Sequence, residues 1–157
     1  MRVFACCCFL LLSPLLCAES LLPAGCQPVA VQGESLTVAV EKNKLVFFHN
    51  LTNADLWLTH PSTKSGVSAG WTSRFQANNW SALVIDKGAF VLNCIESRPG
   101  HEQQVPCEGA VAVCQWQGAK IPAGSQGIFW AGEDLSLGAL TAAIGARGFI
   151  VPQKAIR

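Results

Sequence analysis

The stretch Ser35-Leu36-Thr37-Val38-Ala39-Val40 alternates apolar side chains with small ones, and this pattern decides the fold class of the chain. A period of two residues indicates a β-strand with one buried face. The same signal recurs in short segments that turns rich in Asn, Asp, Gly and Pro separate. The predicted strands are residues 35–40, 45–49, 56–59, 70–75, 81–85, 89–95, 111–116 and 127–131, with residues 105–108 in a hairpin and 149–151 as a final edge strand.

One helix is predicted, near the C-terminus. Residues 137–147 carry apolar side chains at helical spacing, Asp134 or Ser136 can cap the start, and Gly148 fits the position just past the end. Many short strands joined by close turns favour antiparallel sheets, because a parallel sheet needs helical crossovers. The predicted fold is therefore mainly β: an antiparallel β-sandwich, immunoglobulin-like in general architecture, with one short C-terminal helix.

The first 20 residues have the pattern of a signal peptide for secretion. One positive charge precedes an uncharged apolar run, and small residues predict cleavage after Ala18 or Ser20. A membrane anchor is the alternative, but the apolar stretch ends near Ala18, short of the roughly 20 residues that a spanning helix needs. A lipid anchor on Cys17 would need a small preceding residue, and Leu16 is large. The sequence thus predicts a periplasmic or secreted protein.

Length and charge limit the number of domains and the classes of partner that are possible. The chain has 157 residues, with 11 Lys plus Arg and 10 Asp plus Glu. Removal of the signal leaves about 139 residues, which suits a single β-rich domain over residues 21–157 with no further membrane span. The basic residues are scattered singly and the net charge is near zero, which excludes a nucleic-acid partner.

Four of the eight cysteines fall within the predicted signal, and Cys26, Cys94, Cys107 and Cys114 remain. In an oxidising compartment such a set is typical of two disulfides, with three possible connectivities. The Pro-Gly pair at residues 99–100 predicts a hairpin, and counting back from this turn places Cys94 opposite Cys107. We therefore expect a bridge between Cys94 and Cys107, while Cys114 either pairs with Cys26 or stays free.

Three histidines, His49, His60 and His101, are the candidate ligands for a periplasmic metal site. A blue-copper site usually adds a Cys and an axial Met, but the only Met is Met1, which leaves with the signal. Zinc sites usually carry closely spaced cysteine pairs, which the mature sequence lacks. We therefore predict structural roles for these histidines and no metal or cofactor, and keep the metal-binding protein as an alternative function.

A thiol enzyme centred on Cys94, with His101 as base and Glu102 as acid, is the other alternative. Its thiolate would have to stay reduced, whereas export and a nearby Cys107 favour a disulfide. The sequence shows no nucleophile elbow, phosphate-binding loop or paired-carboxylate motif. The interpretation is that the protein is not an enzyme and has no catalytic residues.

The candidate binding residues lie in turns. Among five tryptophans, Trp57 and Trp116 stand in apolar strands and are predicted to be core, whereas Trp80 follows a polar run and is the candidate for an exposed contact. A tryptophan folded over the core is the alternative for Trp80. The hairpin supplies three more candidates, because exposed turns on a rigid scaffold often carry binding residues. The predicted binding residues are Trp80, Arg98, His101 and Glu102.

Three blocks carry a further signal: FFHNLTNADLWLTHP at residues 47–61, SAGWTSRFQANNWSALVIDKGAFVLNCIESRPGHEQQVPC at 68–107, and AVCQW at 112–116. Residues 46–116 resemble the enhanced entry protein EnhB family of Legionella and related bacteria. The resemblance implies an exported bacterial virulence factor linked with entry into host cells. It assigns no catalytic residues, and it implies that the two glycosylation patterns, at Asn50 and Asn79, carry no sugar. The exposed turns and the lack of a catalytic constellation separately predict an interaction protein, with an unidentified protein partner at the cell envelope or host surface.

Overall fold

The computed structural model describes residues 22–40, 42–60, 71–85, 88–125, 129–130 and 135–152, so the predicted signal peptide lies outside the described residues. The described chain forms strands and one helix in the order β1 (Cys26–Val29), β2 (Ser35–Val40), β3 (Lys44–Asn50), β4 (Asp55–His60), β5 (Trp71–Phe75), β6 (Trp80–Ile85), β7 (Gly88–Arg98), β8 (His101–Val105), β9 (Val111–Trp116), β10 (Phe129–Trp130) and α1 (Leu137–Ala146).

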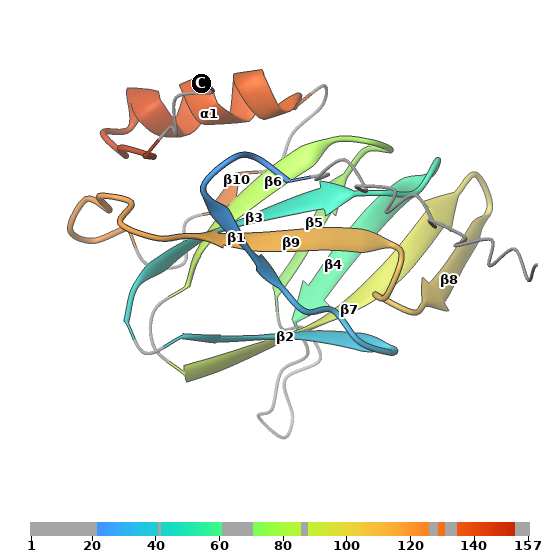
Figure 1. The fold of residues 1–157 in the computed structure, drawn as a ribbon. Coiled ribbons are helices and arrows are strands. Elements are labelled where there is room, and N and C mark those ends of the chain that lie inside the picture. The colour runs from blue at the N-terminus through green and yellow to red at the C-terminus, as the bar shows by residue number, and fades with distance from the viewer. Residues whose placement is uncertain are drawn as a thin grey trace, which may run out of the picture.

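The strands form two antiparallel sheets (Figure 1). Sheet A has the order β1-β9-β3-β6-β10, and sheet B has the order β2-β7-β4-β5. The long strand β7 pairs with β2 along its first half and with β8 along its second half, so β2 and β8 follow each other along one edge. The fold is therefore mainly β, with two antiparallel sheets and one short C-terminal helix, which confirms the predicted fold class.

The main core lies between the two sheets. Alternation places one face of each sheet B strand inward, and these residues meet the inward residues of sheet A. The inward residues are Leu36, Val38, Leu56, Leu58, Leu92 and Cys94 from sheet B and Val46, Phe48, Leu83, Ile85, Val111 and Val113 from sheet A. All of them are buried, as expected for a sandwich core.

A second core lies on the other face of sheet A, under α1. Leu140 and Ile144 of the helix are fully buried there, together with Leu45 and Phe47 of β3. Strand β3 is therefore buried on both faces, which explains why its sequence KLVFFHN is almost continuously apolar. The molecule has three layers in the order sheet B, sheet A and α1 (Figure 1).

The helix begins and ends as the sequence predicts. The Ser136 side chain caps the helix and accepts a hydrogen bond from the backbone N–H of Ala139 at 3.2 Å. Gly148, with a φ of 82°, follows the last turn. The alternative cap, Asp134, lies outside the described residues. Within the described part of the chain, no helix combines the length and apolar character needed to cross a membrane.

The described residues form two disulfides. Cys94 on β7 pairs with Cys107, which confirms the predicted bridge, and Cys26 on β1 pairs with Cys114 on β9. The first bridge lies in the core between the sheets, and the second lies in the core under the helix. Their presence agrees with an exported protein that folds in an oxidising compartment.

Several boundaries differ from the sequence predictions. The hairpin at Pro99-Gly100 is confirmed, but the bounds predicted for its second segment, residues 105–108, are wrong. The turn has only two residues, so β8 begins at once with His101 and ends at Val105. Val105, not Cys107, therefore stands opposite Cys94, and Cys107 reaches the bridge from just beyond the strand. The predicted final strand is reduced to a single bridge between Ile150 and Lys120. Strand β1, interrupted in its pattern by Pro28, was not predicted.

Candidate functional site

An open groove of about 600 Å³ lies on the outer face of sheet B, at the end where β7 turns into β8. Its position follows from the strand register. Asp55 of β4 stands opposite Ser97 of β7, and Ser97 stands opposite Glu102 of β8. In the next row, Trp57 of β4 stands opposite Arg74 of β5. The groove is lined by Asp55, Trp57, Arg74 and Ser97 together with residues 98–102 of the hairpin.

The hairpin that closes the groove has a tight turn. Arg98 pairs with His101, so only Pro99 and Gly100 form the loop. Proline fixes φ at about −65°, and Gly100 has a φ of 74°, which is the combination that a type II turn requires. A side chain at position 100 would be strained in this left-handed conformation. The sequence therefore determines the turn, and the turn fixes the positions of Arg98 and His101.

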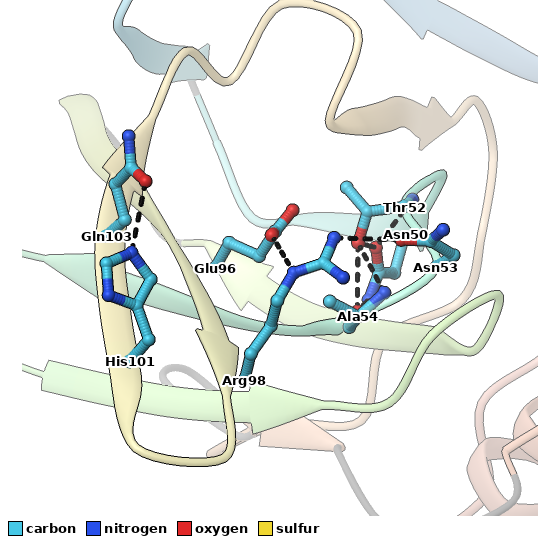
Figure 2. Close-up of polar contacts among 8 residues, drawn as sticks. All are labelled: Asn50, Thr52, Asn53, Ala54, Glu96, Arg98, His101 and Gln103. Atoms are coloured by element: carbon cyan, nitrogen blue, oxygen red, sulfur yellow. Dashed lines mark hydrogen bonds and ion pairs between the residues drawn. The ribbon is translucent and has the colours of Figure 1, made fainter.

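Polar contacts tie the hairpin to the connection between β3 and β4 (Figure 2). The Arg98 Nε donates to Glu96 Oε1 at 2.6 Å, and its Nη2 donates to Asn53 Oδ1 at 3.1 Å. At the tip, the ring of His101 lies beside Gln103, with Nε2 at 3.3 Å from Oε1. Arg98 thus links the hairpin to the connection between β3 and β4, although half of its side chain remains exposed.

The connection that receives Arg98 is itself held by a buried asparagine. Asn50 is fully buried, and its Nδ2 donates to the carbonyl oxygens of Ala54 and Gln76, each at 2.9 Å. Its Oδ1 accepts from the backbone N–H of Thr52 at 2.9 Å and from the Thr52 hydroxyl at 2.8 Å. The pattern Asn50-Leu51-Thr52 is therefore part of a packed turn, and the amide of Asn50 is enclosed in it.

An ion pair and a tryptophan occupy the other side of the groove. Arg74 donates through Nε to Asp55 Oδ2 at 2.8 Å and also contacts this oxygen through Nη2. Trp57 lies half-buried beside this pair on the outer face of β4. Its indole Nε1 is buried and has no hydrogen-bond partner among the described residues. This side of the groove therefore offers an aromatic surface next to fixed charged groups.

Of the four predicted binding residues, the structure brings three together. Arg98, His101 and Glu102 all line the groove. The predicted exposure of Trp80 is wrong: its side chain is only 7% exposed, and it packs edge-to-face against Phe47. Its backbone N–H donates to the carbonyl oxygen of Leu135, just before the helix, at 2.9 Å. Trp80 therefore belongs to the core under α1.

Four lining residues were missed by sequence reasoning: Asp55, Trp57, Arg74 and Ser97. Trp57 was predicted to be core, which is wrong because the alternation of β4 places Leu56 and Leu58 inward and Trp57 outward. That alternation is a signal the sequence already carried. The position of Trp116 was predicted correctly, since it is buried in the core under the helix.

The three histidines lie in different places. His49 stacks on Trp80, with ring centroids 4.3 Å apart, on the helix side of sheet A. His60 stacks on Phe90, at the opposite end of β4 from the groove, and its Nδ1 lies 2.6 Å from the Val91 carbonyl oxygen. His101 lies at the hairpin tip. Among the described residues, no group of three or more His, Cys, Asp or Glu side chains is arranged to hold a metal.

Burial gives His49 a distinct titration. The pKa of His49 is lowered because burial penalises the charged imidazolium, and the nearby carbonyl of Asn78, 3.3 Å from Nε2, opposes this only in part. Its Nδ1 is buried and has no partner in the described part of the chain. Burial therefore favours the neutral form of the ring that stacks on Trp80.

Cys94 offers no free thiol in this structure, because it is fully buried and bonded to Cys107. Comparisons with protein-family models, with curated proteins and with solved structures found no significant match to this chain. The resemblance to the EnhB family therefore stays a prediction. The groove and the hairpin that closes it are the site on which a function can be argued from geometry.

Proposed function

We propose that this chain is an exported, non-catalytic interaction protein that binds a protein partner at the cell envelope or host surface through the groove and its hairpin. In line with the resemblance to the EnhB family, the proposed role is to promote entry of a bacterium into host cells. The observation that carries the proposal is the groove of about 600 Å³ that residues of four strands and the hairpin line together.

Three features of the groove support binding. Trp and Arg, which dominate binding energy at interfaces, both line it, as Trp57, Arg74 and Arg98. The hairpin is preorganised by the Pro99-Gly100 turn and by the contacts of Arg98 with Glu96 and Asn53. A preorganised loop loses less conformational entropy on binding than a free one. The bridge at Cys94 anchors β7, the strand that leads into the turn.

The metal-binding and thiol-enzyme alternatives have less support. His49 and His60 lie on different sheets, each stacked on an aromatic ring of its own. The thiol enzyme would require reduction of a fully buried bridge before Cys94 could react. Elemental analysis and thiol titration of the native protein test these two alternatives directly.

Affinity capture from envelope and host-membrane extracts tests the proposal. The triple variant Arg98→Ala, His101→Ala, Glu102→Ala changes three residues that line the groove. Each removal costs at most about 1 kcal/mol of stability, because exposed charges contribute little. The native protein is expected to enrich a partner that the triple variant does not retain.

A matched control removes as many charged or polar groups elsewhere. The variant Glu34→Ala, Lys42→Ala, Lys120→Ala changes three exposed residues, none of which lines the groove. We expect it to recover the same partner as the native protein, at the same yield. Equal recovery by the groove variant and the control would reject the hairpin as the contact surface.

A further inference from the structure

The groove runs across the strands of sheet B. Its lining residues come from β5, β4, β7 and β8, which are successive neighbours in the hydrogen-bonded order. Adjacent strands lie about 4.8 Å apart, so a path across these four strands is about 14 Å long. The groove is therefore long enough for an extended segment of a chain-like ligand.

Backbone groups of the floor are already occupied. Strand β4 pairs with β5 on one side and β7 on the other, and this part of β7 pairs with β4 and β8. A ligand that lies over β4 and β7 therefore meets the side chains of these strands. An extended peptide would bring a backbone N–H and C=O at each residue, and the floor offers no main-chain partners for them. A ligand recognised through side chains alone suits this floor better.

The charges that line the groove cancel. The lining residues include two arginines, Arg74 and Arg98, and two carboxylates, Asp55 and Glu102. Each arginine is also engaged, Arg74 by Asp55 and Arg98 by Glu96. A groove with balanced and paired charges attracts neither a polyanion nor a polycation. Its groups offer hydrogen-bond donors and acceptors in similar number, and this suits a neutral ligand with both.

The aromatic surface narrows the ligand class further. Trp57 is half-buried in the row next to Asp55 and Ser97, so part of its apolar ring faces the groove beside carboxylate, hydroxyl and guanidinium groups. Sugar rings combine apolar C–H faces with hydroxyls that donate and accept at once. An aromatic body surrounded by a few fixed polar groups is complementary to such a ring.

We infer that the groove binds a short segment of a neutral oligosaccharide carried by the partner or by the surface on which it sits; this inference rests on the proposed function. Trp57 packs against the face of a sugar ring, and Asp55, Arg74, Ser97 and Glu102 bind its hydroxyls. The protein partner of the proposed function is then a glycoprotein, or is held next to a glycan.

Titration of the oxidised protein with defined sugars tests the inference. The probes are neutral hexasaccharides of glucose, mannose and N-acetylglucosamine, with a hexasaccharide of hyaluronate as the acidic comparison. We expect at least one neutral probe to bind, and Trp57→Ala to weaken it about tenfold or more while Trp57→Phe retains most of the affinity. Glu102→Ala changes an exposed residue that lines the groove, so it should fold normally and also weaken binding, which keeps the test valid if Trp57→Ala folds poorly. The matched control is Lys42→Ala, which is expected to bind as the native protein does.

Salt gives a second readout. The affinity for a neutral probe should be nearly the same at about 50 mM and about 500 mM salt, because no net charge is screened. Binding of the acidic probe alone, binding that salt abolishes, or neutral binding that Trp57→Ala leaves unchanged would overturn the inference. So would the absence of binding by every neutral probe. When one of these results overturns the sugar inference, the triple groove variant decides whether the proposed function also fails. If this variant still loses the partner, the proposed function stands. If it captures the partner normally, the proposed function fails together with the sugar inference.

Discussion

The two sheets of this protein differ in how much of them is covered. In sheet A, neighbouring residues of β3 serve both cores: Leu45 and Phe47 pack under α1, and Val46 and Phe48 pack against sheet B. Among the described residues, sheet B contributes to a core on one face only, and its other face carries Asp55, Trp57 and Arg74. We therefore expect sheet A to stabilise the fold, and the open face of sheet B to carry charged and aromatic groups that stability does not require.

Removal of the disulfide that closes the longer loop gives the largest expected effect. The bridge Cys26–Cys114 spans 88 residues, and its loss through two Cys→Ala substitutions should lower the free energy of unfolding by about 4–5 kcal/mol. The bridge Cys94–Cys107 spans only 13 residues, and its loss should cost about 3 kcal/mol. Urea unfolding of both double variants compares the two losses in the free energy of unfolding. A larger loss from the shorter loop would contradict the chain-entropy account.

A core substitution in sheet A is expected to exceed a substitution on the open face of sheet B. Phe47 is fully buried and packs edge-to-face against both Trp80 and Trp116, so Phe47→Ala should cost about 3–5 kcal/mol. Trp57 is half-buried, so Trp57→Ala should cost only about 1–2 kcal/mol although the side chain is larger. Urea unfolding compares them, and equal losses would show that the open face is part of the stabilising core.

The pH dependence of stability is expected to reflect His49. Burial lowers the pKa of His49, so below pH 6.5, the ordinary pKa of histidine, the unfolded chain takes up a proton that the folded protein resists. The stability contributed by the neutral ring is thus present above pH 6.5 and is lost as the pH falls from there towards the lowered pKa. His49→Gln should flatten this part of the stability profile. An unchanged slope in the variant would show that another group causes it.

The smallest effect is expected at the ion pair on the open face. The side chain of Arg74 is 53% exposed and that of Asp55 is 24% exposed, so solvent screens their attraction. A double-mutant cycle with Arg74→Ala and Asp55→Ala should give a coupling of about 0–1 kcal/mol. A coupling of several kcal/mol would mean that the ion pair on this face contributes substantially to the stability of the fold.

The local sequence pattern was enough to predict much of the fold. The alternation of residues 35–40 predicted β2, and the capping residues around the helical pattern predicted α1 within one residue of its end. The partner of Cys94 followed from the Pro-Gly turn, although the register is offset by two residues. These features depend on neighbours in sequence, which is why pattern alone could find them.

The groove could not be predicted in the same way. Asp55, Arg74, Ser97 and Glu102 become neighbours only through the order β5-β4-β7-β8, and sequence spacing does not determine sheet order. The same holds for Trp80, whose polar flanking sequence indicated exposure. It is buried because the segment before α1 bonds to its backbone and because Phe47 packs on its ring, and both contacts are distant in sequence.

Site-specific photo-crosslinking tests most directly the claim that the open face of sheet B, and not the helix, meets the partner. A photoreactive residue replaces exposed Gln104, in the row next to Glu102, or exposed Ala142 on α1. After exposure to envelope and host-membrane extracts, we predict a crosslinked species from position 104 and none from position 142. A crosslink from position 142 with none from position 104 would contradict the account.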